Sequence, residues 1–320
     1  MPTIQYLTIT SDHAGQRLDN FLISRLKGLP KSRLYRIIRK GDLRINKKRV
    51  KPDYRLQEGD IIRIPPLRLS PPTKKAIPSE QLISLFEKAI IFEDKSFLAL
   101  NKPTGIAVHG GSGIHLGVIE TLRQLRPQLK FLELAHRLDR DTSGCLLLVK
   151  KSSVLKELHE LLRSGNIKKT YLALVAGHWP KSLLKVDVPL SKNQLRSGER
   201  IVRVQTEGKI SLTQFSVQQY FTESTLVAAV PITGRTHQIR VHAQYAKHPI
   251  IGDEKYGNKD VNKEMRKLGC KRLFLHASQL KFDLPSTGQT IILNAELPDD
   301  LNAVLKQLTL SPNHQYSDIT

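Results

Sequence analysis

Apolar and polar residues alternate along much of the chain with the two-residue period of β-strands. A fully apolar run at 145–149 is instead typical of a strand buried on both faces. Because many short strands are separated by few long helices, the pattern predicts an α+β fold with a mainly antiparallel mixed sheet. The expected strands are residues 4–9, 60–64, 90–94, 97–101, 131–135, 145–149, 167–175, 200–204, 212–217, 225–230, 272–277 and 290–295.

Helical spacing of apolar residues is confined to a few segments. Leu18, Phe21 and Leu22 share one helical face near the N-terminus, and Leu34, Ile37 and Ile38 share another in a helix expected to end at Gly41. Farther along, residues 152–162 form a helical pattern that Ser152 and Ser153 are expected to cap and Gly165 to end, and residues 234–245 form another.

A proline-rich and basic stretch at residues 66–81 divides the sequence. Prolines stiffen a chain and remove backbone donors, so this stretch is predicted to be a linker between domains. The expected organisation is a small N-terminal domain at 15–65, the linker at 66–81, a larger domain at 82–308 and a polar, disordered tail at 309–320.

The charge balance points to a polyanionic partner. The 320 residues contain 51 Lys plus Arg against 29 Asp plus Glu, a formal net charge of +22. Nucleic acid is the first expectation, because no apolar run is long enough to span a bilayer and no signal-peptide pattern is present. The two cysteines, Cys145 and Cys270, form no Cys-x-x-Cys pair, which suits a reducing cytoplasm and excludes a zinc ribbon or a disulfide scaffold.

One short segment between two expected strands concentrates chemistry. Leu138 is apolar in the middle of it and indicates that the loop dips inward, while Arg137 and Arg140 flank Asp139 and favour an ionised, nucleophilic carboxylate. A solvated turn is the competing interpretation. The segment reads His136-Arg137-Leu138-Asp139-Arg140-Asp141-Thr142-Ser143-Gly144.

This string closely resembles the signature of the RluA-type pseudouridine synthases. The resemblance implies that Asp139 is the catalytic nucleophile. It also implies that Tyr171, in a Lys-x-Tyr-x-Ala-x-Val motif, lies against the target base, although half-buried packing is the usual role of a strand tyrosine. In a Gly-Arg-Thr-His-Gln-Ile-Arg motif, Arg240 is implied to pair with Asp139.

The RNA contacts are expected from several basic residues. Residues 15–65 look like an S4-type RNA-binding domain, whose basic helix carries Lys31, Arg33, Arg36 and Arg39. In the larger domain, His136, Arg137 and Arg235 are candidates for substrate binding, with Arg137 holding a flipped nucleotide. Residues 197–204 resemble the RluC branch of the family, so several uridines of 23S ribosomal RNA are the expected substrate. No cofactor, metal or obligate protein partner is implied.

Two alternatives stay open at this point. A non-catalytic S4-type RNA-binding or ribosome-assembly factor would explain the charge, but it leaves Asp139, Tyr171 and Arg240 without a role. A metallohydrolase using His136 and Asp139 lacks any further ligand cluster. The glycine-rich residues 102–113 lack the ending of a nucleotide-binding loop and are expected to shape the wall of the active cleft, with plain turn geometry as a rival.

Overall fold

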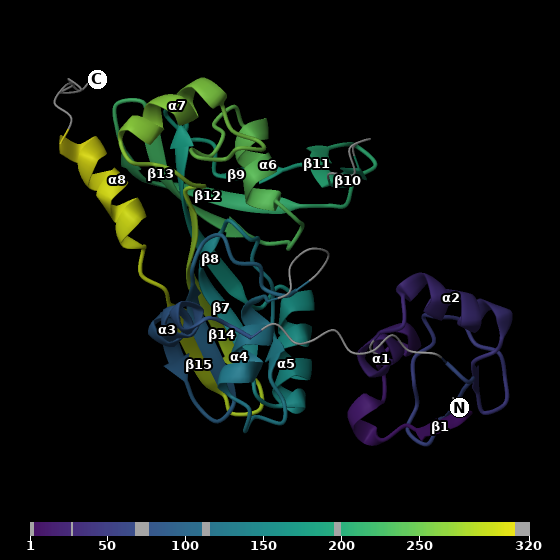
Figure 1. The fold of residues 1–320 in the computed structure, drawn as a ribbon. Helices are drawn as coiled ribbons and strands as arrows, with labels where there is room; N and C mark the ends of the chain where they lie inside the picture. The colour runs from purple at the N-terminus through teal and green to yellow at the C-terminus, as the bar shows by residue number, and fades with distance from the viewer. Residues whose placement is uncertain (1–2, 27, 68–76, 111–115, 195–199, 311–320) are drawn as a thin grey trace. The chain divides into compact units, whose positions relative to one another are not determined.

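The chain forms two compact units in a computed structural model, Met1–Ile77 and Pro78–Thr320 (Figure 1). The structure describes residues 3–26, 28–67, 77–110, 116–194 and 200–310. Parts of three sequence predictions lie outside these ranges: most of the linker, the end of the glycine-rich segment and residues 311–320 of the tail. The same holds for residues 197–199 of the stretch that resembles the RluC branch.

The N-terminal unit packs two helices against a three-stranded sheet of order β1-β3-β2. The apolar faces predicted for the helices are buried in one core with Ile45, Ile62 and Ile64 of the sheet. Gly41 ends the second helix in the left-handed conformation, with a φ of 78° that favours glycine. The elements are β1 (Gln5–Thr8), η1 (Ser11–His13), α1 (Leu18–Arg25), α2 (Lys31–Lys40), β2 (Arg44–Ile45) and β3 (Ile61–Ile64).

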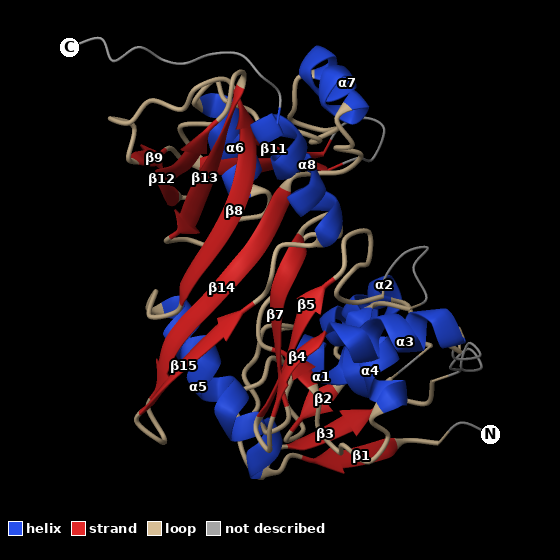
Figure 2. Ribbon diagram, turned by 90° about the vertical axis from the view of Figure 1, so that its left-hand side faces the viewer, coloured by secondary structure: helices blue, strands red, loops and turns tan. Residues whose placement is uncertain are grey.

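The C-terminal unit is built on a ten-stranded mixed sheet, which confirms the predicted α+β fold (Figure 2). Neighbouring strands in the sheet follow the order β4-β5-β7-β14-β8-β13-β12-β9. In addition, β15 pairs with β14 and β6 pairs with β7. The pairing of β7 with β14 is parallel and the other described pairings are antiparallel. The strands are β4 (Ile90–Glu93), β5 (Phe97–Lys102), β6 (Glu133–Leu134), β7 (Ser143–Val149), β8 (Lys168–Ala176), β9 (Lys185–Asp187), β12 (Leu212–Tyr220), β13 (Ser224–Pro231), β14 (Leu275–Leu284) and β15 (Gln289–Asn294).

Six helices in the described part of this unit flank the sheet, and a separate hairpin lies beside it. The hairpin consists of β10 (Leu190–Gln194) and β11 (Arg200–Val204). The helices are α3 (Glu80–Ala89), α4 (Val118–Leu125), α5 (Ser152–Arg163), α6 (Gln238–Tyr245), α7 (Lys259–Lys267) and α8 (Asp299–Leu310).

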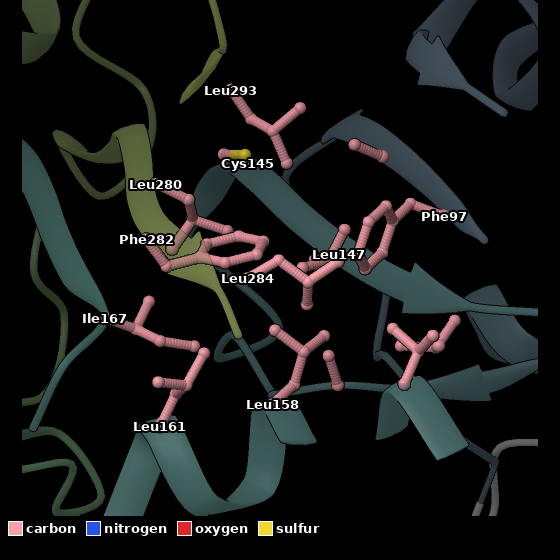
Figure 3. Packing of buried hydrophobic residues seen from close by; sticks show 14 of the residues in the cluster. Phe97, Cys145, Leu147, Leu158, Leu161, Ile167, Leu280, Phe282, Leu284 and Leu293 are labelled. Carbon is pink, nitrogen blue, oxygen red and sulfur yellow. The ribbon is translucent and has the colours of Figure 1, made fainter. Parts of the chain in front are cut away.

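Residues 145–149 of β7 are apolar, and side chains from helices pack against both faces of this stretch. Cys145, Leu147 and Val149 belong to one cluster with Leu158 and Leu161 of α5, and Figure 3 shows Leu147 and Leu158 close together in it. The residues between them, Leu146 and Leu148, belong to a second cluster on the opposite face, with side chains from α3 and α4. The buried strand predicted from the unbroken apolar run is therefore confirmed.

The long strands β8 and β14 run side by side and connect the two halves of the sheet (Figure 2). In the half beyond β8, Ala173, Val227 and Ala229 pack with Ile239 and Ala243 of α6. On the other face of that half, residues of α7 and α8 cover the sheet. Because both strands enter both halves, a side chain near the middle of β8 lies where the halves meet.

Several local predictions were wrong. Lys151, not a serine, is the N-cap of α5, and it makes no side-chain cap hydrogen bond. Helix α6 begins only at Gln238, because His237 has a φ of 55° and the preceding motif residues form a turn. Helix α8 extends to Leu310, so residues 309 and 310 are helical. Helix α3 starts at Glu80 within the segment predicted as linker, since Ser79 caps it by accepting a hydrogen bond from the Leu82 N–H.

The junction of β7 with β14 yields a stability prediction at Gly144. This residue has a φ of 113°, and a Cβ placed on it would lie 2.2 Å from the Ala277 carbonyl oxygen. We expect Gly144→Ala to lower the free energy of unfolding by about 3 kcal/mol or more, because the two strands must separate. Denaturant unfolding measures the change.

Gly288→Ala is the matched control for this substitution. Gly288 also has a positive φ, 66°, but its Cβ would meet nothing within 4 Å. The control should lose only the conformational term of about 1–2 kcal/mol. Equal losses of unfolding free energy in the two variants would show that the close approach of β14 to Gly144 does not add to the cost of the substitution.

Candidate functional site

The charged loop at 136–142 connects β6 to β7 and is supported by the last residue of β5 and the segment after it. The Lys102 side chain is fully buried, and its Nζ donates to the carbonyl oxygens of Pro103, Ile106 and Arg140 at 2.7, 3.0 and 3.1 Å. Thr104 Oγ1 donates to the Asp141 carbonyl at 2.8 Å. These bonds fix the backbone that follows Asp139, and Leu138 is buried as the sequence predicted.

A cleft of about 810 Å³ opens above this loop. Its walls are the loop itself, the end of α5, the start of β8 and residues 231–240. Residues 102–110 do not line it, so the expectation that the glycine-rich segment shapes the wall of the cleft was wrong for its described part. That segment instead holds the loop in place from behind.

Asp139 faces two basic side chains inside the cleft. Its Oδ2 lies 3.9 Å from Arg240 Nη1 and 3.9 Å from His237 Nε2. The Asp139 side chain is 31% exposed, so it remains accessible from the cleft. The carboxylate therefore sits in a positive field without being tied up in a short hydrogen bond to either group.

Arg240 makes its closest contacts with a residue that the motifs did not identify. Its Nε and Nη2 donate to the two carboxylate oxygens of Asp253 at 2.6 and 2.7 Å, and both side chains are buried. Burial lowers the pKa of Arg240, but the hydrogen bonds and charge of Asp253 outweigh it and leave the pKa raised. The pKa of Asp253 is correspondingly lowered, since Arg240 overcomes the opposing effect of burial.

His237 is held by a neighbouring tyrosine. Its Nδ1 lies 2.8 Å from the Tyr256 hydroxyl, which also accepts a hydrogen bond from the Val202 N–H at 3.0 Å. Burial lowers the pKa of His237, which favours the neutral ring. The two ring nitrogens face different groups, Nδ1 the Tyr256 hydroxyl and Nε2 the Asp139 carboxylate.

Tyr171 lines the same cleft from β8 and is half-buried. Burial raises its pKa, and the negative charge of Asp139 acts in the same direction. Alanines lie opposite it on both neighbouring strands, Ala229 on β13 and Ala277 on β14. These small neighbours leave space beside the ring at the point where the halves of the sheet meet.

The remaining candidates in the larger unit also line the cleft. Arg137 and Arg235 are exposed, and Arg235 Nε donates to the Ile210 carbonyl at 3.1 Å. His136 Nε2 accepts a hydrogen bond from the Leu147 N–H at 3.1 Å. Burial lowers the pKa of His136 from 6.5 to about 4, with the charge of Lys169 adding to the effect, so the ring is neutral.

The four basic candidates of the smaller unit lie on α2. Lys31, Arg36 and Arg39 are exposed and Arg33 is half-buried, while the apolar face of the helix is turned into the core. Their charges are therefore available to a polyanion.

Comparison with known proteins identifies the family. A family model described as RNA pseudouridylate synthase matches residues 96–245, and an S4 domain model matches residues 16–62. Ribosomal large subunit pseudouridine synthase C of Haemophilus influenzae is 54% identical over 308 residues, covering 96% of this chain and 95% of that protein. The chain belongs to the RNA pseudouridylate synthase family.

Further relatives support the same assignment. The protein of the same name from Escherichia coli (strain K12) is 52% identical over 310 residues, covering 96% of this chain and 97% of its own length. The solved structure titled Human RNA Pseudouridylate Synthase Domain Containing 4 superposes with a TM-score of 0.60 at 28% identity, covering 73% of this chain and 98% of that chain. The predicted family, its RluC branch and the enzyme class are confirmed.

The described residues contain neither a cluster of metal ligands nor a membrane-spanning helix. No group of three or more His, Cys, Asp or Glu side chains there could hold a metal ion. Among the same residues, no helix is both long enough and apolar enough to cross a membrane.

Three residues of the site were assigned no role from the sequence. His237 and Lys169 line the cleft, and Asp253 holds Arg240 from outside it. Asp253 follows the apolar pair Ile250 and Ile251, a signal that the carboxylate enters the core, but its partner is distant in sequence. His237 stands inside the motif that contains Arg240 and was given no role. Lys169 lines the cleft, and burial lowers its pKa. Its position two residues before Tyr171 is the signal in the sequence that could have identified it.

The neutral state of His136 predicts a pH dependence of stability. Its pKa in the folded protein is about 4, below the ordinary 6.5, so the unfolded chain takes up a proton first as the pH falls. The stabilising contribution is present above pH 6.5 and is lost between about 6.5 and 4. We expect His136→Gln to reduce the slope of unfolding free energy against pH by up to about 1.4 kcal/mol per pH unit in this window.

Denaturant unfolding at several pH values from 7.5 to 4.5 measures this slope. Glutamine keeps an acceptor near the Leu147 N–H but takes up no proton. A variant whose slope equals that of the wild type contradicts a neutral, half-buried His136.

Proposed function

We propose that this protein isomerises uridines to pseudouridines in large-subunit ribosomal RNA, with Asp139 as the catalytic nucleophile. The observation that carries the proposal is that Asp139 is the one carboxylate among the described residues lining the cleft. The other charged side chains of the lining are cations: Arg137, Arg163, Lys169, Arg235 and Arg240. A cationic cleft with one accessible carboxylate suits a polyanionic substrate and a nucleophilic step.

The reaction needs no external reductant, oxidant or group donor. The N1–C1′ bond breaks, the uracil turns, a C5–C1′ bond forms, and the C5 proton leaves while N1 gains a proton. A carboxylate serves each route to this outcome, whether it attacks C1′, attacks C6 or first removes a ribose proton. In all three routes Asp139 must be ionised to act.

The target uridine must leave the RNA stack to reach Asp139, because the carboxylate lies inside the cleft. In this proposal Tyr171 packs on the extruded uracil, and Arg137 occupies the space that the base vacates. Arg235, exposed at the edge of the cleft, contacts backbone phosphate. His136 shapes the floor of the cleft as a neutral ring beside Asp139.

The substrate class follows from the relatives and from the charge. The relatives are named as synthases of the large ribosomal subunit, so we assign 23S ribosomal RNA as the partner and the cytoplasm as the location. The N-terminal unit, which contains residues 15–65, acts as the RNA-binding domain, and the unit that begins at Pro78 is the catalytic domain. A purely RNA-binding protein would not need the arrangement of Asp139, Tyr171 and Arg240 in one cleft.

Removing the charge of Asp139 tests the nucleophile. We expect Asp139→Asn to abolish pseudouridine formation in a 23S RNA transcript while changing the Kd for that RNA less than about threefold, because one amide replaces one cleft carboxylate. Release of tritium from uridine labelled at C5 measures turnover, and filter binding measures affinity.

Asp141→Asn is the matched control, since it makes the same chemical change two residues away. Asp141 is 46% exposed and pairs with Arg140 at 3.1 Å. The control should keep wild-type turnover. Normal turnover by Asp139→Asn would reject the assignment.

The basic face of α2 yields a second prediction. We expect Arg36→Gln to weaken RNA binding and to reduce the slope of log K against log salt by about 1, because one phosphate contact is lost. Single-turnover isomerisation at saturating enzyme should stay at the wild-type rate. An unchanged salt slope would mean that this part of α2 does not touch RNA.

A further inference from the structure

The guanidinium of Arg240 lies near two carboxylates, and it is much closer to that of Asp253 than to that of Asp139. Nε and Nη2 form the two short hydrogen bonds to Asp253, and Nη1 is left pointing toward Asp139 at 3.9 Å. The strong, two-point ion pair is thus made with a residue outside the cleft lining. Asp139 therefore interacts with the positive charge of Arg240 but accepts no close hydrogen bond from it.

We infer that Asp253 is a positioning residue for the reaction, one that keeps Arg240 at a fixed distance from the catalytic carboxylate. This inference rests on the proposed function. A free guanidinium would form its own two-point pair with Asp139, since planar forks match carboxylates well. That pair would occupy the oxygen lone pairs that a nucleophile needs.

Asp253 is itself held rigidly. Its Oδ1 accepts hydrogen bonds from the backbone N–H groups of Lys255 and Tyr256 at 2.9 and 3.0 Å. Asn262 of α7 braces the same turn by donating to the Asp253 carbonyl at 3.1 Å and accepting from the Gly252 N–H at 2.8 Å. The position of the Asp253 carboxylate is therefore fixed by contacts that do not involve Arg240.

The same turn also reaches the second basic group that faces Asp139. Tyr256 follows Asp253 by three residues, its ring lies 5.0 Å from the Arg240 guanidinium carbon, and its hydroxyl contacts His237. Residues 253–256 thus position both Arg240 and His237. Neither Asp253 nor Tyr256 lines the cleft, so both act through other residues.

Asp253→Asn tests the inference by kinetics. Asparagine can still accept the backbone hydrogen bonds, but it releases the guanidinium. We expect the single-turnover rate to fall about 10²-fold, as for an ångström-scale misplacement of a catalytic group, with the RNA Kd within about threefold of wild type. A folded Asp253→Asn protein whose rate stays within threefold of wild type overturns the inference.

Asp300→Asn is the matched control variant. Asp300 forms the same kind of fork with Arg272, at 2.6 Å to Nε and 3.2 Å to Nη2, on α8. The substitution removes an Arg–Asp pair that belongs to the same unit, and neither Arg272 nor Asp300 lines the cleft. We expect its rate to remain within about threefold of wild type, and a loss as large as that of Asp253→Asn would make the effect a general one on the fold.

A spectroscopic measurement separates this inference from the proposed function and does not need Asp253→Asn to fold. In nitrogen-15 spectra of the full chain, the Arg240 Nε–H should be protected from exchange and its guanidinium should rotate slowly. Both properties should persist in Asp139→Asn, because Asp253 holds the group. Loss of both in Asp139→Asn overturns the inference, whereas absent pseudouridine formation by the wild type would reject the proposed function alone.

Discussion

The site depends on the close approach of β14 to β7 at Gly144. Ala277 of β14 pairs with Gly144 on one side and with Tyr171 of β8 on the other. A side chain at position 144 would collide with the Ala277 backbone, so the glycine lets the strand pass. This one contact brings the loop of Asp139 beside Tyr171, although 31 intervening residues separate the two in sequence.

Electrostatics then determine what the cleft can do. Isolated buried charges are costly, and Arg240 and Asp253 offset that cost by two short hydrogen bonds. The ion pair leaves Arg240 charged, so its field acts on Asp139 in a partly desolvated cleft where it is weakly screened. Burial lowers the pKa of the histidines at 136 and 237, which leaves arginine and lysine as the cations of the cleft lining.

Much of the architecture could be predicted from periodicity, because the central strands of the larger sheet and the helices of the smaller unit bury regular apolar faces. The run at 145–149 is buried on both faces, and the spacing of Leu34, Ile37 and Ile38 gave the correct helix. The start of α6 could not be predicted, since the spacing of apolar residues does not mark the left-handed backbone that His237 adopts. The motifs located the cleft residues, but they assigned Arg240 to Asp139 alone. Its bidentate partner, Asp253, is set by the turn before α7, and no local pattern marks that turn as part of the site.

The most direct test of the account is pseudouridine mapping of 23S ribosomal RNA from cells that lack this protein and from cells complemented with wild type or Asp139→Asn. The account predicts that specific sites disappear in the deletion, return with the wild type and stay absent with the variant. A complete set of sites in the deletion strain, or their restoration by Asp139→Asn, would contradict it.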